Sequence, residues 1–117
     1  RPAYDQRFMR VGLFFEGLAD ASDGYGQFHI SPSGAPAYEK RFKWVGHFCQ
    51  SLAQAQDDTG YFHIKPDGTP AYEWRGLRNG PFNQQSLAWA EIREIIEGKK
   101  RITRILIDNQ GEIISKI

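Results

Sequence analysis

The chain has 117 residues, 40% of them hydrophobic and 25% charged, so it is long enough and apolar enough to bury a modest core as one domain. Its formal net charge of +1 excludes a protein that grips nucleic acid mainly through a basic field. No apolar run approaches the roughly 18 residues that a membrane span needs, and no signal peptide is visible, so we expect no membrane contact and slightly favour a cytoplasmic location.

Two near-copies of one segment follow each other without a gap, at residues 2–35 and 36–69. They are identical at 18 of 34 aligned positions. A period of this size is typical of repeat proteins. A third copy, residues 70–117, begins faithfully and then diverges. We therefore predict a single repeat domain over residues 1–117 with a modified terminal repeat, and we interpret the chain as a fragment of a longer protein.

Each of the first two copies carries a strand pattern followed by a turn. Residues 27–30 and 61–64 place Phe and Ile at alternate positions, which is one face of a strand. A Pro-x-Gly turn follows each of them. Residues 14–21 and 48–55 fit either a strand or a short helix, and their brevity and flanking glycines favour a strand. The predicted fold class is therefore mainly β, with tandem repeats of short strands and turns.

One α-helix is predicted in the divergent third copy, at about residues 86–98. The pattern has a possible N-cap, an apolar stripe at helical spacing and a final glycine: Ser86, Trp89, Ile92, Ile96 and Gly98. Beyond it, residues 105–111 repeat the strand and turn of the earlier copies. We interpret the helix as an insertion that covers the apolar end of the array. Docking of this helix on a neighbouring domain or chain is the alternative.

A short element of the first copy resembles the bacterial WG-repeat family. Residues 14–19, Phe-Phe-Glu-Gly-Leu-Ala, are similar to the aromatic-x-x-Gly-Leu-Ala segment of that family, and residues 48–53 and 82–88 are looser versions. The Trp-Gly pair that names the family is replaced by Gly-Gln-Phe-His-Ile and Gly-Tyr-Phe-His-Ile. The resemblance implies a β-rich array used as an interaction or ligand-contacting module, often attached to other domains, with no catalytic residues.

Two histidines, His29 and His63, occupy equivalent positions of the first two copies. Zinc sites built from histidine need further ligands nearby, and the third copy has Leu106 at this position. A packed position tolerates leucine, whereas a metal site does not. We therefore predict hydrogen-bonded structural histidines, with ligand contact as the alternative, and we predict neither a metal site nor a cofactor.

An arginine recurs in all three copies, as Arg7, Arg41 and Arg75. Each follows an acidic residue by two positions: Asp5, Glu39 and Glu73. Residues at i and i+2 share a face of a strand, so each arginine is expected to pair with its own or a neighbouring acid and to hold successive repeats together. The alternative is a solvated surface pair worth less than about 1 kcal/mol.

The positions that vary while the repeat frame stays constant are the candidates for binding. Trp44, His47 and Trp74 stand at such positions, and exposed aromatic residues are enriched at interaction sites. We predict that they contact a protein partner, an adjoining domain or a carbohydrate-like ligand. Ordinary packing against the next repeat is the alternative.

No catalytic motif is recognisable, so we expect a non-enzymatic binding module. The alternative is a regulatory or substrate-presenting appendage of an enzyme whose catalytic domain lies outside this chain. The one basic cluster, residues 98–104, is interrupted by apolar residues and is a weak signal for nucleic acid. Nucleic acid is therefore not an expected partner.

Overall fold

The computed structural model describes residues 10–116, which form ten β-strands and no helix. The first sheet contains β1 (Arg10–Phe15), β2 (Leu18–Asp23) and β3 (Gly26–Ile30). The second sheet contains β4 (Trp44–Cys49), β5 (Leu52–Asp57) and β6 (Gly60–Ile64). The third, in spatial order β10-β9-β8-β7, contains β7 (Arg78–Asn79), β8 (Ala88–Ile96), β9 (Lys99–Ile107) and β10 (Ile113–Lys116). The prediction of a mainly β fold is confirmed.

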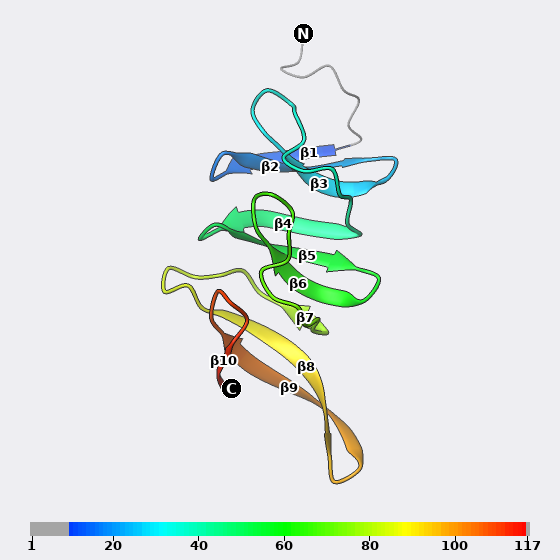
Figure 1. Cartoon of the computed structure of the whole chain (residues 1–117), viewed down its shortest axis with the longest axis vertical. Helices are drawn as coiled ribbons and strands as arrows, with labels where there is room; N and C mark the ends of the chain where they lie inside the picture. The colour runs from blue at the N-terminus through cyan, green and yellow to red at the C-terminus, as the bar shows by residue number, and fades with distance from the viewer. Residues whose placement is uncertain (1–9, 117) are drawn as a thin grey trace.

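The three sheets follow one another along the length of the molecule (Figure 1). The described chain measures 59 × 29 × 18 Å, and all pairing within its sheets is antiparallel. Strand β4 contacts all three strands of the first sheet, and β7 contacts β6. Two linkers connect the sheets, the first at residues 31–43 and the second at residues 65–77. Contact between consecutive sheets therefore joins their buried residues into one hydrophobic cluster that includes residues of all three sheets.

The core is built from small residues paired with large ones across two neighbouring strands of each sheet: β2 and β3, β5 and β6, and β8 and β9. Every pair places an alanine opposite a phenylalanine or an isoleucine, and every member is at most 3% exposed. The pairs are Ala19–Ile30 and Ala21–Phe28, Ala53–Ile64 and Ala55–Phe62, and Ala88–Ile107 and Ala90–Ile105. The first and second sheets have this register at an offset of 34 residues. Small side chains leave room for the large ones, so the same packing recurs in the third sheet.

Two-residue turns close three of the hairpins. Both central residues of each turn have positive φ, at Glu16–Gly17 (52° and 83°), Gln50–Ser51 (54° and 66°) and Glu97–Gly98 (53° and 77°). Turns of this kind match the right-handed twist of the strands that they join. The last of them lies between β8 and β9.

The predicted helix at about residues 86–98 is wrong, because this segment forms β8 and its turn into β9. Ser86 has a φ of 60° in the loop before β8 and is no helix N-cap. Residues 87–90 repeat the Leu-Ala-x-Ala pattern of β2 and β5, and burying both alanines requires a strand. Nine residue pairs with β9 satisfy the backbone, so sheet pairing overrides the helical propensity of the segment.

The third sheet has an exposed edge strand, β10, and no helix of the described residues packs on it, contrary to the prediction from the sequence. Ile113 pairs with Ile107 at the beginning of β10. The two linkers make an equivalent contact, because Pro36 bridges Ile30 and Pro70 bridges Ile64. After this contact the linkers turn away from their sheets, whereas β10 continues to pair with β9 as far as Lys116. The strand and turn predicted at residues 105–111 are confirmed, because the amide of Gly111 donates to the carbonyl of Asp108 as the amide of Gly68 donates to that of Lys65.

Candidate functional site

The ring of His29 joins the first sheet to the second. Its Nε2 lies 2.7 Å from the carbonyl oxygen of Gly46 on β4, and its Nδ1 lies 2.5 Å from the hydroxyl of Tyr38 in the first linker. A carbonyl only accepts, so Nε2 carries the proton and Nδ1 accepts the hydroxyl hydrogen of the tyrosine. Both nitrogens of the neutral ring are thus used inside the protein.

His63 makes the same two bonds one sheet further along. Its Nε2 donates to the carbonyl of Gly80 at 2.8 Å, and its Nδ1 accepts from the hydroxyl of Tyr72 at 2.6 Å. Burial lowers the pKa of His63 to about 4, and burial also lowers the pKa of His29. Over residues 10–116, no group of three or more His, Cys, Asp or Glu side chains is placed to hold a metal ion. These histidines therefore connect sheets.

Arg41 lies flat on the first sheet. Its guanidinium carbon is 3.6 Å from the centre of the Phe28 ring, and its Nε donates to Asp23 Oδ2 at 3.1 Å. The carbonyl of Glu39 accepts a further bond at 2.9 Å. The acidic partner therefore differs from the predicted one, because Glu39 contributes its backbone and the carboxylate comes from the end of β2.

Arg75 repeats this arrangement on the second sheet. Its guanidinium carbon is 3.6 Å from the centre of the Phe62 ring, its Nε is 3.5 Å from Asp57 Oδ2, and it donates to the carbonyl of Glu73 at 3.1 Å. Cation–π contact and a fixed guanidinium plane hold the second linker against the sheet that precedes it. Arg7, the third member of the predicted set, lies outside the described residues.

The three residues predicted to bind a partner lie in different places. Trp44 is half-buried at the start of β4, with its ring 6.2 Å from that of Tyr61. His47 is exposed, and its ring lies 4.3 Å from that of Phe15. Trp74 is half-buried in the second linker. The structure does not bring the three together in one pocket, and of the three only Trp74 lines the groove described next.

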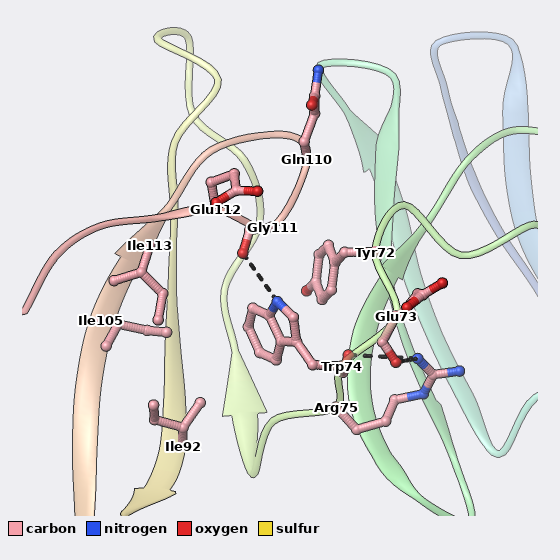
Figure 2. Close-up of a pocket in the computed structure, with 10 residues that line it drawn as sticks. All are labelled: Tyr72, Glu73, Trp74, Arg75, Ile92, Ile105, Gln110, Gly111, Glu112 and Ile113. Atoms are coloured by element: carbon pink, nitrogen blue, oxygen red, sulfur yellow. Dashed lines mark hydrogen bonds between the residues drawn. The ribbon is translucent and has the colours of Figure 1, made fainter.

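An open groove of about 650 Å³ lies between the second linker and the third sheet (Figure 2). The linker contributes four consecutive residues to its wall, and β8, β9, β10 and the turn before β10 contribute the rest. The lining residues are Tyr72, Glu73, Trp74, Arg75, Ile92, Ile105, Gln110, Gly111, Glu112 and Ile113. The groove thus depends on the pairing of β8, β9 and β10, which brings distant parts of the chain together.

Trp74 is held in this groove by two contacts. Its indole Nε1 donates to the carbonyl oxygen of Gly111 at 3.0 Å, and its ring stacks on that of Tyr72 at a centroid distance of 4.5 Å and an angle of 26°. Figure 2 shows the indole between Tyr72 and the isoleucines of the third sheet. The indole is therefore oriented before any partner binds, which lowers the entropy lost on binding.

The groove combines an apolar wall with a rim of mixed charge. Ile92, which is half-buried, and Ile113, which is 54% exposed, form the accessible apolar wall, whereas Ile105 lines the groove but is fully buried. Glu73 and Glu112 supply acidic groups at the rim, and Arg75 supplies a basic one. An apolar side chain would fit against the isoleucines and the indole, while polar groups on either side of it would meet the rim.

Sequence reasoning found Trp74 but missed the residues that complete the groove. Residues 105–111 match the earlier strand and turn, so this match could have placed Gly111 beside the preceding linker. No sequence signal marks Ile92 or Ile113 as lining residues, because their position depends on the hairpin that replaces the predicted helix.

No protein-family model, curated protein or solved structure matches this chain. The resemblance to WG repeats therefore stays a prediction from its motifs. Among the described residues, no helix is long and apolar enough to cross a membrane.

Proposed function

We propose that the chain is a non-enzymatic interaction module, a repeat array of the WG-like type that binds a segment of a protein partner in the Trp74 groove. The observation that carries this proposal is the fixed indole beside an apolar wall. Tryptophan residues anchored in this way dominate the binding energy of many interfaces, and a polar rim around an apolar centre is the usual arrangement.

The use of His29 and His63 supports a binding role over a catalytic one. A general base or a nucleophile activator needs a free ring nitrogen within reach of the substrate. His29 and His63 are fully buried, and both nitrogens of each ring are hydrogen-bonded to neighbouring residues. The Trp74 groove contains no histidine or cysteine.

A carbohydrate-like ligand is the second candidate for the same groove, since a sugar ring can stack on an indole. The composition of the wall favours a peptide, because Ile92 and Ile113 offer no hydrogen bonds to sugar hydroxyls. A polar hydroxyl buried against them without a partner costs free energy. An aliphatic or aromatic side chain of a partner protein has no such cost.

A peptide-display selection against the purified chain tests the proposal, with a glycan array as its second arm. Peptides that bind the unmodified chain should bind Trp74→Ala and Ile113→Ser at least about tenfold more weakly, since each substitution removes apolar contact. Ile114→Ser is the matched control, because Ile114 is also 54% exposed and does not line the groove.

Three results would contradict the proposal. They are failure to select any peptide, equal loss in the Ile113→Ser and Ile114→Ser variants, and binding to glycans in place of peptides. Thermal unfolding of each variant shows whether a loss of binding is a loss of folding. Trp74→Phe serves where Trp74→Ala unfolds, because it keeps an aromatic ring against Tyr72 and removes the bond to Gly111.

A further inference from the structure

Phe14 on β1 is exposed where its counterparts are buried. Its exposed fraction is 42%, whereas Phe48 and Phe82, which follow at intervals of 34 residues, are 2% and 3% exposed. Each of the two buried phenylalanine rings is covered by a histidine of the preceding sheet. The His29 ring lies 4.5 Å from Phe48, and the His63 ring lies 4.5 Å from Phe82.

The rest of the docking pattern that surrounds Phe48 also recurs on β1. Beside that ring, His29 donates to the carbonyl of Gly46, and the amide of Val45 donates to Gln27 Oε1 at 3.0 Å. In the first copy these positions are again glycine and valine, at residues 12 and 11. Strand β1 thus has the residues with which β4 docks on the sheet before it.

The described chain has no remaining histidine to cover Phe14. His29 and His63 are already bonded to the second and third sheets, and His47 is exposed beside Phe15. A second copy of the chain, docked by its third sheet, would offer Leu106 at the equivalent position. The partner that fits β1 is therefore a further unit with an unused Gly-x-Phe-His-Ile strand.

We infer that the β1 face is a docking surface for one more repeat unit of this type, one whose Gly-x-Phe-His-Ile strand is unused. Its histidine covers Phe14 and donates to the carbonyl of Gly12. This surface lies on the first sheet (Figure 1), whereas the Trp74 groove lies between the second linker and the third sheet, and its role is independent of the binding proposed there.

The test adds the missing unit to the whole chain. A second copy of residues 36–69 replaces Arg1, so that it meets Pro2 as Thr69 meets Pro70 in the natural sequence. Phe14→Ala is then compared in the chain alone and in the extended chain by chemical denaturation. We expect the substitution to raise the unfolding equilibrium constant at least about tenfold more in the extended chain, because only there is the ring buried.

Phe15→Ala is the matched control. Phe15 is 40% exposed, close to Phe14, but its ring contacts His47 within the chain itself. Its substitution should therefore have the same effect with and without the added unit. A second variant changes the histidine of the added unit, His63→Leu in that copy only, and should abolish the extra sensitivity of Phe14.

The inference fails if Phe14→Ala has the same effect in both chains. It also fails if limited proteolysis shows the added unit unfolded while the original chain stays intact, because an unoccupied docking face of this kind should hold it. Full retention of the extra sensitivity in the His63→Leu copy would likewise overturn the proposed histidine contact.

Discussion

Gly111 and Tyr72 approach each other so closely that a methyl group on the glycine would lie 2.5 Å from the tyrosine ring system. Gly68 and Tyr38 stand in the same relation at 2.6 Å. The hydroxyl of Tyr72 reaches the buried His63, while its ring supports Trp74 in the groove. The turn at Gly111 therefore fixes both the contact between sheets and the wall of the candidate binding site.

Substitution of Gly111 by alanine should destabilise the protein more than the same change at Gly98. Both glycines have positive φ, 81° and 77°, so each substitution costs about 1 kcal/mol for the strained backbone. A methyl group at Gly98 meets nothing within 4 Å, whereas at Gly111 it overlaps Tyr72 and adds about 1–3 kcal/mol. Urea denaturation of the two variants measures the difference, and equal losses would show that the turn does not press on the tyrosine.

Removal of the Tyr72 hydroxyl should cost about 1–3 kcal/mol of folding free energy, because Nδ1 of His63 then lacks a donor in a buried site. Burial raises the pKa of Tyr72, so the hydroxyl stays protonated and can donate. Tyr72→Phe is compared with Tyr25→Phe, since Tyr25 is 87% exposed and should tolerate the change. A neutral Tyr72→Phe substitution would mean that the hydroxyl does not stabilise the buried ring.

The sequence predicted β3 and β6 because alternation of apolar residues is local. Residues 27–30 and 61–64 carry that alternation, and both form strands. The strands favoured at residues 14–21 and 48–55 are each interrupted by a turn, at Glu16–Gly17 and at Gln50–Ser51. The error at residues 86–98 has a local cause as well, since Trp89, Ile92 and Ile96 imitate a helical stripe. Strand β8 in fact separates them, with Trp89 on one face and Ile92 and Ile96 on the other.

The groove was only partly predictable, for a physical reason. Trp74 was found because its position varies between copies while the surrounding frame is constant. The residues opposite it reach the groove only through the pairing of β8 with β9 and of β9 with β10. Pairing register depends on contacts between distant segments, and a local pattern misread as helix removes those contacts from consideration.

Replacement of Arg75 by lysine should destabilise the protein although the charge is kept. The guanidinium lies flat on Phe62 at 3.6 Å and also bonds the carbonyl of Glu73, and a lysine ammonium cannot satisfy both. We expect a loss of about 1 kcal/mol, which denaturation at high salt should leave largely unchanged because stacking dominates. Arg93→Lys is the control, since Arg93 is exposed. A loss that disappears in salt would indicate a simple ion pair with Asp57.

Acidification should weaken the fold before most carboxylates titrate, and His63 should account for much of the effect. Burial lowers its pKa from 6.5 to about 4, so the folded state holds the neutral ring and the unfolded chain takes up the proton first. The stabilisation is complete above pH 6.5 and is lost as the pH falls from 6.5 towards 4. The loss amounts to about 3 kcal/mol for this residue, and His29 adds to it in the same direction.

The measurement is the free energy of unfolding in urea at intervals between pH 7.5 and 4.5. His63→Leu, which introduces the residue found at position 106, should reduce the slope by up to about 1.4 kcal/mol per pH unit. An unchanged slope in this variant would show that His63 has the same pKa in the folded and the unfolded protein.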